Sequence, residues 1–431
     1  MNSHLLLVMI LGIQMSSGYA QDTLKSMQQL RAEVNYEEKN VPDYALPSLF
    51  AGSNDANLID ATTWNNKIRP EWLELFEREM YGHFPDEGLH VSFIINSDQM
   101  VFGDKFRRKE VTINVSNGRH GHDISLLLYL PTKVRGPVPM FVGLNFYGNH
   151  TIHSDPGISI HRSWARNNED YGISNNRVDD KSRGIRANRW PVEQIIQAGF
   201  GLGTIYYGDI DPDYDDGFNN GIHSLLDEEV DKSTLSSISA WAWGLSQALN
   251  YFEQDSQIDH DHVAVIGHSR LGKTSLLAGA LDQRFAMVVS NDSGCGGAAL
   301  SRREFGETVH IINRSFPHWF NERFNHYNEQ VNKLPFDQHS LLALAAPRPL
   351  YVASASEDLW ADPHGEFLAA KEASKVYNLL GEKGLEDASM PAADSPSNKG
   401  VVGYHMRSGK HDITSYDWAQ YLSFASRHFK K

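Results

Sequence analysis

One stretch of eight residues carries two patterns that imply different chemistry. Residues 267–274 read Gly-His-Ser-Arg-Leu-Gly-Lys-Thr, which matches the phosphate-binding pattern G-x-x-x-x-G-K-[ST]. In that interpretation Lys273 and the backbone N–H groups of the loop bind a nucleotide. The same stretch places Ser269 close to the G-x-S-x-G arrangement of a nucleophile elbow, with one extra residue before the second glycine. In that interpretation Ser269 attacks the carbonyl carbon of an ester or amide.

The N-terminus favours the second interpretation, because it is typical of an exported protein. Residues 5–13 are apolar, and Gly18-Tyr19-Ala20 supplies small residues at the two positions that matter for cleavage. We predict a signal peptide over residues 1–20, cleaved after Ala20, and a secreted or periplasmic protein. The apolar stretch is too short to span a bilayer. The alternative is a core segment of the mature protein, since no Lys or Arg precedes the stretch. An exported protein meets little ATP, which argues against a nucleotide site.

Length and composition indicate one large α/β domain or two average ones. The chain has 431 residues, of which 41% are hydrophobic and 11% aromatic, ample for a packed core. The net charge of −15 argues against nucleic acids and anionic membrane surfaces as partners. The single cysteine, Cys295, excludes an intramolecular disulfide. We expect a monomer that uses no cofactor.

The chain divides into an N-terminal arm, a group of hairpin strands and a longer alternating region. Residues from about 21 to 66 are polar and turn-rich, and we predict that they wrap around a single domain spanning 21–431. Pro70 predicts the start of an amphipathic helix. The predicted strands are 89–95, 109–115, 124–130, 140–146, 201–207, 263–266, 286–290, 350–353 and 401–407, and the predicted helices are 191–198, 237–252, 271–281, 365–380 and 416–429. This order predicts an α/β fold, a three-layer αβα sandwich with a mostly parallel sheet and antiparallel N-terminal strands.

The members of a hydrolase triad occur in the order that an α/β-hydrolase requires. Ser269 directly follows an apolar strand, so its hydroxyl lies at the carboxyl end of the sheet, where ligands bind in such folds. A later strand, 350–356, delivers two candidate acids, Glu357 and Asp358. His411 follows the last predicted strand, whereas His405 lies within that strand. We therefore predict His411 as the general base.

The segment Asp209–Gly217 is rich in carboxylates but does not match a calcium-binding loop. When the EF-hand pattern is aligned on Asp211, the sixth position is Asp216 instead of Gly, and the twelfth is Ile222 instead of Glu. We predict a solvated or helix-capping loop near the mouth of the site. The four histidines between residues 310 and 339 lack H-x-x-x-H or H-E-x-x-H spacing, so no metal site is predicted.

The sequence around these residues resembles one enzyme family, the 4-O-methyl-glucuronoyl methylesterases, also called glucuronoyl esterases or carbohydrate esterase family 15, in its bacterial branch. The elbow G-[CH]-S-R-x-G-K, here residues 267–273, is the most specific part of the resemblance and makes the nucleotide pattern a coincidence. The resemblance covers nearly all of the chain after residue 20. The other matching blocks are 149–151 (NHT), 207–211 (YGDID), 240–244 (AWAWG), 290–303 (SNDSGCGGAALSRR), 316–320 (FPHWF), 346–349 (APRP), 356–362 (SEDLWAD) and 409–412 (GKHD).

The resemblance implies an α/β-hydrolase fold and a serine esterase that cleaves the ester between glucuronic acid side groups of xylan and lignin alcohols. Ser269 would be the nucleophile and His411 the base. The family places the orienting carboxylate at one of two positions, and this sequence has an aspartate at both, Asp358 and Asp292. We favour Asp358, because an aspartate at 292 is one methylene shorter than the glutamate often found there.

The resemblance also assigns roles to residues around the nucleophile. The residue after a nucleophile gives its backbone N–H to the oxyanion hole, and the guanidinium of Arg270 would also face the developing negative charge. Two cations in the first turn of a helix oppose the helix dipole, so Arg270 and Lys273 are not explained by helix stability. Lys273 and Glu307 would bond sugar hydroxyls. Trp360 would pack on a ring face, and its alternative is a core tryptophan.

Other function classes fit parts of this pattern. The same scaffold could carry another α/β-hydrolase activity, such as a xylan acetyl esterase or a peptidase. A P-loop protein would bind ATP through Lys273. A catalytically silent, carbohydrate-binding relative would keep the fold and hydrolyse no ester.

Overall fold

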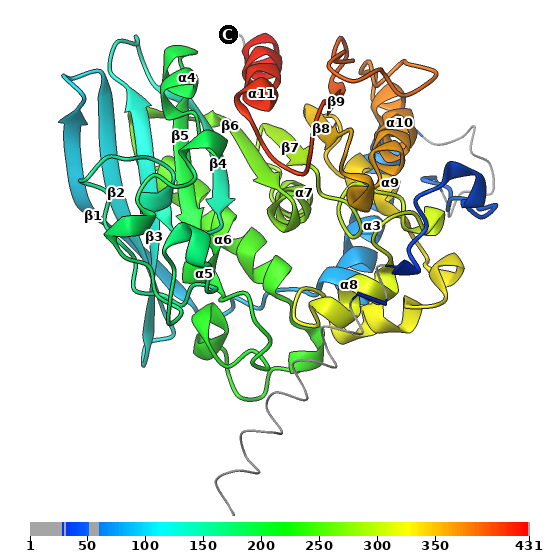
Figure 1. Ribbon diagram of the computed structural model, residues 1–431, viewed down its shortest axis with the longest axis horizontal. Coiled ribbons are helices and arrows are strands. Elements are labelled where there is room, and N and C mark those ends of the chain that lie inside the picture. The colour runs from blue at the N-terminus through cyan, green and yellow to red at the C-terminus, as the bar shows by residue number, and fades with distance from the viewer. Residues whose placement is uncertain (1–27, 30–31, 51–59, 430–431) are drawn as a thin grey trace, which may run out of the picture.

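The computed structural model describes residues 28–29, 32–50 and 60–429. Within these residues nine strands form one sheet in the order β1-β2-β3-β5-β4-β6-β7-β8-β9 (Figure 1). The strands are β1 (His90–Val101), β2 (Phe106–Ser116), β3 (Gly121–Pro131), β4 (Val138–Asn145), β5 (Gly201–Tyr206), β6 (Ile258–His268), β7 (Met287–Asn291), β8 (Leu350–Ala355) and β9 (Val402–Arg407). Every predicted strand is present, with ends shifted by several residues. The predicted signal peptide, 1–20, lies outside the described residues.

The sheet has an antiparallel and a parallel part, as the sequence predicts. The pairs β1–β2, β2–β3 and β3–β5 are antiparallel, and these strands form one end of the molecule in Figure 1. From β5 through β4, β6, β7 and β8 to β9 all neighbours are parallel. The four strands β6 to β9 lie side by side in chain order, so the segments that follow them meet at one edge of the sheet.

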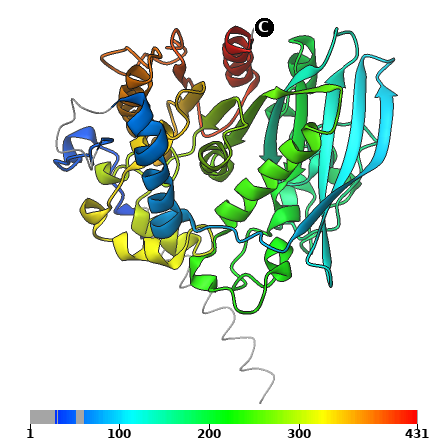
Figure 2. The ribbon, with the colours of Figure 1, turned by 180° about the vertical axis from the view of Figure 1, so that it is seen from behind.

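Helices cover both faces of the sheet, and alternate strand residues pack against each layer. Met140 and Val142 of β4 belong to the larger apolar cluster, whereas Phe141 between them belongs to the smaller one on the other face. The larger cluster contains α6 and α7, which Figure 2 shows from behind, and the smaller contains α4 and α11. The helices are α2 (Ala61–Thr63), α3 (Arg69–Phe76), α4 (Val192–Gln197), α5 (Tyr207–Ile210), α6 (Ser237–Phe252), α7 (Arg270–Leu281), α8 (Val309–Ser315), α9 (Gln338–Ala343), α10 (Pro363–Leu379) and α11 (Ser415–His428). In the described part of the chain, no helix is long and apolar enough to cross a bilayer.

The first long helical segment begins earlier than Pro70 predicts. Helical turns run without a break from α2 through the π-type turns Trp64–Ile68 into α3 and on to Tyr81. The Asp60 side chain caps the start by accepting the N–H of Thr63 at 2.7 Å. Pro70 therefore lies inside the segment. It follows directly on a wide π-type turn, where the regular pattern of backbone hydrogen bonds is already interrupted.

Candidate active site

Ser269 occupies a sharp turn between β6 and α7, where a nucleophile elbow is expected. Its φ of 59° and ψ of −130° are strained for a residue with a side chain. The Ser269 N–H donates to the Asn291 carbonyl at 2.9 Å, which ties the turn to β7. This geometry presents the serine side chain to a pocket at the carboxyl edge of the sheet.

The two glycines of the elbow are required by close packing. A Cβ atom on Gly267 would lie 1.8 Å from the carbonyl oxygen of Leu271, in the first turn of α7. A Cβ atom on Gly272 would lie 2.9 Å from the Cβ atom of Ser293. Helix α7 therefore approaches β6 and the segment after β7 more closely than any larger residue permits. The glycine spacing that resembles a phosphate-binding loop serves this packing.

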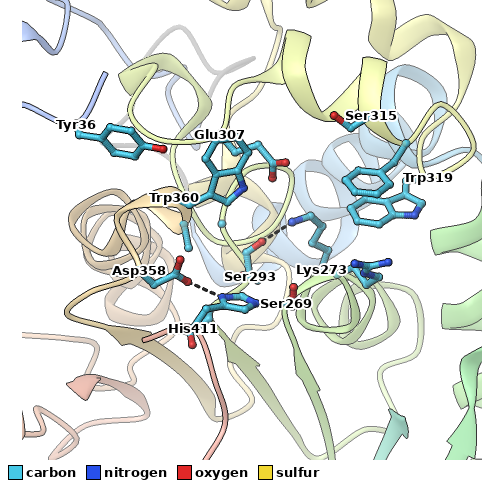
Figure 3. A pocket seen from close by; sticks show the side chains of 15 residues that line it. Tyr36, Ser269, Lys273, Ser293, Glu307, Ser315, Trp319, Asp358, Trp360 and His411 are labelled. Atoms are coloured by element: carbon cyan, nitrogen blue, oxygen red, sulfur yellow. Dashed lines mark hydrogen bonds and ion pairs between the residues drawn. The ribbon is translucent and has the colours of Figure 1, made fainter. Parts of the chain in front are cut away.

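The pocket above Ser269 has a volume of about 500 Å³ and brings together segments from the whole chain (Figure 3). Ser269 and His411 lie next to each other on its floor, and the imidazole lies between the serine and Asp358. The pocket is lined by Tyr36, Ser269, Arg270, Lys273, Asp292, Ser293, Gly294, Glu307, Ser315, Phe316, Trp319, Asp358, Trp360, Ala361 and His411. Every site residue predicted from the sequence is in this set.

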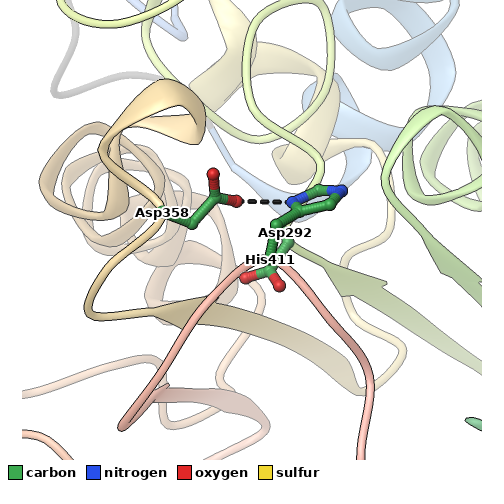
Figure 4. A group of neighbouring side chains, drawn as sticks. All are labelled: Asp292, Asp358 and His411. Carbon is green, nitrogen blue, oxygen red and sulfur yellow. Dashed lines mark hydrogen bonds and ion pairs between the residues drawn. The ribbon is translucent and has the colours of Figure 1, made fainter.

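The imidazole of His411, which follows β9, is held by a carboxylate on the loop after the neighbouring strand β8. Its Nδ1 atom lies 2.6 Å from Oδ2 of Asp358 (Figure 4). A carboxylate accepts hydrogen bonds, so Nδ1 carries the proton and Nε2 presents a lone pair. The side chain of Asp358 is 6% exposed and that of His411 is 40% exposed, so the imidazole is open to the pocket and its carboxylate partner is shielded.

Asp292 lies close to His411 but bonds to a different group. Its Oδ2 atom accepts the backbone N–H of Asp412 at 3.2 Å, and its buried Oδ1 has no partner among the described residues. Burial, together with the negative charges of Glu366 and Asp358, raises the pKa of Asp292 well above its ordinary value. Asp292 therefore favours the neutral carboxyl and fixes the backbone beside the histidine.

The loop that carries His411 is clamped by Arg407 at the end of β9. The guanidinium donates to the carbonyl oxygens of Ser408 at 2.9 Å, Lys410 at 2.7 Å and Asp412 at 3.0 Å. These acceptors flank His411 on both sides, so the loop backbone is fixed around the imidazole. His405, the other candidate base, is buried within β9 and bonds to Asp417, away from the pocket.

One wall of the pocket is formed by Lys273, Glu307 and Trp360. Glu307 and Trp360 come from two segments that lie side by side. Lys273 is 4% exposed, and its Nζ atom lies 2.5 Å from the carbonyl oxygen of Ser293. The Glu307 N–H donates to the Trp360 carbonyl at 2.9 Å. Burial raises the pKa of Glu307, and the positive charge of Lys273 reduces this increase. Burial lowers the pKa of Lys273, and the negative charge of Glu307 reduces this decrease. A half-buried tryptophan beside two such polar groups suits a sugar ring with hydroxyls.

Comparison with known proteins identifies the family of the chain. A family model described as glucuronyl esterase of fungi matches residues 224–381. Carbohydrate esterase MZ0003, from an unknown prokaryotic organism, is 49% identical over 398 residues, which are 91% of this chain and 92% of the relative. The chain belongs to carbohydrate esterase family 15.

Solved structures of this family agree along nearly the whole chain. A promiscuous CE15 esterase from the marine bacterial metagenome superposes with a TM-score of 0.86 at 49% identity, covering 92% of this chain and all of that one. The glucuronoyl esterase from Solibacter usitatus gives a TM-score of 0.84 at 43% identity, with 91% and 100% covered. The α/β-hydrolase prediction is confirmed, and the CE15 protein is a carboxylic ester hydrolase. The nucleotide-binding alternative is therefore discarded.

The prediction of a solvated or helix-capping loop at Asp209–Gly217 is wrong for its first three carboxylates, which are buried and whose side chains cap none of the described helices. Asp209, Asp211 and Asp213 are at most 3% exposed, whereas Asp215 on the same segment is exposed. These three side chains point into the interior of the CE15 fold from α5 and the loop after it, and hydroxyl, imidazole, indole and guanidinium groups bond to them. Partners distant in sequence make this burial possible, so composition could not reveal it.

Tyr36, Phe316 and Trp319 line the pocket and had no assigned role. Tyr36 comes from the N-terminal arm, and its ring packs edge-on against Phe305 at 6.3 Å between centroids. Phe316 and Trp319 stack at 3.7 Å with an interplanar angle of 3°. The aromatic block at 316–320 was a usable signal for these two rings, because aromatic rings offer large apolar faces and a polar edge for contact. Tyr36 has no local signal.

One group of three acidic or histidine side chains in the described part of the enzyme has ligand atoms within 4.8 Å of one another. Its members are Asp292, Asp358 and His411. Two of the three candidate ligand atoms are already joined by the 2.6 Å bond between Asp358 and His411. This arrangement suits proton transfer.

Glu366 supports the floor of the site and gives a pH-dependent stability. Its Oε1 atom accepts the N–H groups of Ser293 at 2.8 Å and Gly294 at 2.9 Å, and Oε2 accepts the Ser354 hydroxyl at 2.6 Å. Burial raises the pKa of Glu366 from 4.5 to about 7, although these bonds oppose the change. An acid with a raised folded pKa stabilises the fold fully below its unfolded pKa and loses that contribution as pH rises through the folded pKa.

Glu366→Gln, which mimics the neutral acid, is therefore expected to remove this dependence. The free energy of unfolding of the variant should rise relative to the wild type by about 3 kcal/mol between pH 4.5 and pH 8. Urea denaturation at several pH values measures this difference. Glu366→Ala removes the titrating group together with its hydrogen bonds, so as the control it should show the same change with pH at a lower stability throughout. If the difference in unfolding free energy between Glu366→Gln and the wild type did not change with pH, the raised pKa of Glu366 would be contradicted.

Proposed function

We propose that this protein is a serine esterase that hydrolyses the ester between 4-O-methyl-glucuronic acid side groups of glucuronoxylan and lignin alcohols. Relatives named 4-O-methyl-glucuronoyl methylesterase support the substrate class, including one from Phanerochaete chrysosporium that is 31% identical over 212 residues. The observation that carries the proposal is the alignment of Ser269, His411 and Asp358 beside a wall of Lys273, Glu307 and Trp360.

In the proposed mechanism Ser269 attacks the ester carbonyl while Nε2 of His411 takes its proton. Asp358 accepts the Nδ1–H bond throughout, which fixes the tautomer and stabilises the imidazolium. The oxyanion forms beside the backbone N–H and the guanidinium of Arg270. His411 then protonates the leaving alcohol, and a glucuronoyl–serine ester remains. Water, deprotonated by the same imidazole, cleaves this acyl-enzyme and restores Ser269.

The wall of Lys273, Glu307 and Trp360 favours an ester substrate whose acid component is a sugar. The ammonium of Lys273 and the carboxyl of Glu307 offer a donor and an acceptor for adjacent hydroxyls. Trp360 offers an apolar face to the ring. An acetyl group carries no hydroxyls and no ring, so a xylan acetyl esterase would not need these three side chains.

Lys273→Met is therefore expected to separate the two substrate classes. It should lower kcat/KM for benzyl glucuronate by about 10- to 100-fold, the cost of one charge-assisted hydrogen bond. Hydrolysis of 4-nitrophenyl acetate should stay nearly unchanged. Steady-state assays with both esters measure this, and Lys333→Met, at an exposed position outside the pocket, is the matched control.

A wild-type assay with acetylated xylan and a peptide completes the test. Faster release of acetate than of benzyl alcohol would replace the uronate ester by the acetyl ester as the substrate. Cleavage of the peptide amide would move the protein to another hydrolase class. The alternative of a silent carbohydrate-binding protein requires that none of these substrates is cleaved.

We also propose that the protein is exported, with cleavage after Ala20, and that it acts as a monomer. The apolar segment and small residues near position 20 support export. A polymeric plant-wall substrate cannot enter a cell, so an enzyme for it has to act outside the cytoplasm.

A further inference from the structure

Asp213 is a buried carboxylate that reaches the active site from a loop after β5. The side chain has no exposed surface. The oxygen Oδ2 accepts the Tyr207 hydroxyl at 2.9 Å and the guanidinium Nη1 of Arg270. The oxygen Oδ1 lies 2.9 Å from Nε2 of His318 and 2.7 Å from Nε1 of Trp319. Each oxygen therefore accepts two hydrogen bonds, and Oδ2 also lies 3.5 Å from Nη2 of a second arginine, Arg166.

The charge of Asp213 is stabilised by its partners. Burial alone would raise the pKa of the carboxyl, but Arg270 and the bonds from His318 and Trp319 hold it well below its usual range. A buried ionised carboxylate is costly unless its partners are complete. Asp213 is therefore a fixed negative charge, and its position depends on groups from α5, the elbow and the 318–319 segment.

Arg270 is held by this charge on one side and by aromatic rings on the others. The centre of its guanidinium lies 4.5 Å from the ring centroid of Trp319, 5.4 Å from Phe316 and 5.7 Å from Phe146. Its side chain keeps 22% of its surface exposed and lines the pocket beside Ser269. A long, flexible side chain is thus confined to one orientation in which part of its edge faces the reaction.

We propose that Asp213 is a positioning residue for ester hydrolysis, which orients Arg270 and anchors Trp319 so that the guanidinium faces the carbonyl oxygen of the bound ester. The inference rests on the proposed function. A charged donor stabilises an oxyanion best when it is oriented before the reaction, because no energy is then spent on reorganisation. Without the charge of Asp213, Arg270 remains present but is free to turn toward solvent.

A double-mutant cycle tests this dependence. Arg270→Ala should lower kcat for benzyl glucuronate by about 10²- to 10³-fold, as for loss of an oxyanion donor. Asp213→Asn keeps the shape but removes the charge, and should lower kcat by about 10- to 100-fold with little change in KM. In the Arg270→Ala background, Asp213→Asn should have almost no further effect on kcat. Equal effects in both backgrounds would overturn the inference.

Asp211 provides a matched control from the same loop. It is equally buried and bonds to His223 at 3.0 Å and Ser237 at 2.5 Å, with no bond to Arg270. Asp211→Asn should lower the melting temperature and leave kcat unchanged. A kcat loss as large as that of Asp213→Asn would assign both residues a general structural role and overturn the inference.

Two further measurements separate the possible failures. If Asp213→Asn does not fold, Tyr207→Phe removes one donor to the same Oδ2 atom, and its loss of kcat should likewise vanish in the Arg270→Ala background. The absence of any such coupling would overturn the inference.

Ser269→Ala is assayed in parallel, because residual activity there would refute the proposed serine mechanism itself. If Ser269→Ala is inactive but Asp213→Asn lowers kcat equally in the wild-type and Arg270→Ala backgrounds, only the positioning role of Asp213 is refuted.

Discussion

Ser269→Ala is expected to lower kcat for benzyl glucuronate by about 10⁶-fold, the largest effect of any single change in the pocket. The residue is the one hydroxyl that the elbow presents beside His411 in Figure 3. Without it no acyl-enzyme forms, and the remaining groups can only bind the ester. Steady-state and single-turnover assays measure the loss, and the formation of a covalent adduct with a serine-directed phosphonate should disappear as well.

The fold and the binding wall should survive this substitution. The backbone bond from Ser269 to Asn291 does not involve the side chain, so the melting temperature should stay close to that of the wild type. Calorimetric titration with the uncleaved ester should still detect binding. Ser408→Ala, on the loop that carries His411 but at an exposed position outside the pocket, is the matched control and should keep full activity. Activity of Ser269→Ala near the wild-type level would contradict the mechanism.

Asp358→Asn is expected to lower kcat by about 10⁴-fold, because an amide in this place favours the wrong tautomer of His411. At present the carboxylate accepts the Nδ1–H bond at 2.6 Å, which leaves Nε2 free to take the Ser269 proton. An asparagine can rotate to donate to Nδ1, and the proton of the imidazole then moves to Nε2. Measurement of kcat for both benzyl glucuronate and 4-nitrophenyl acetate should give similar losses, since the tautomer matters for any ester.

Asp292→Asn is the matched control for Asp358→Asn and should have a much smaller effect. Burial and neighbouring carboxylates favour the neutral form of Asp292, and its bond is to the backbone N–H of Asp412. An asparagine keeps that acceptor and resembles the neutral acid in charge and shape. A larger loss for Asp292→Asn than for Asp358→Asn would exchange the roles of the two carboxyls.

Patterns within short stretches were sufficient to predict the nine strands and the longer helices, whereas the short helices α2, α5, α8 and α9 were not predicted. Strands buried on both faces are mostly apolar, as in β4 and the second half of β6, and α6 and α10 between strands begin at capping side chains. The order of Ser269, Asp358 and His411 relative to β6, β8 and β9 also follows from the sequence. Parallel strands end at the same edge, so residues that directly follow them meet there without further information.

The helix before β1 shows where such local reasoning fails. Pro70 lies in the first turn of α3, as predicted, but π-type turns already precede α3 from Trp64 onward. Trp64 and Ile68 of these turns are buried in the core. The helical segment therefore extends N-terminal to Pro70, and the sequence holds no separate signal for this extension.

The sequence by itself determined the succession of the nine strands and the longer helices, the elbow at Ser269 and the set of candidate acids and bases, because each depends on neighbours within a few residues or on strand order. Only the tertiary structure decided which carboxyl meets His411, that Asp213 is buried against Arg270, and that Tyr36 of the arm lines the pocket. Those outcomes depend on ångström-scale distances between segments far apart in the sequence, 53 residues for Asp358 and His411 and 57 for Asp213 and Arg270. Such distances are set by the packing of whole layers, and the residue types alone do not specify them.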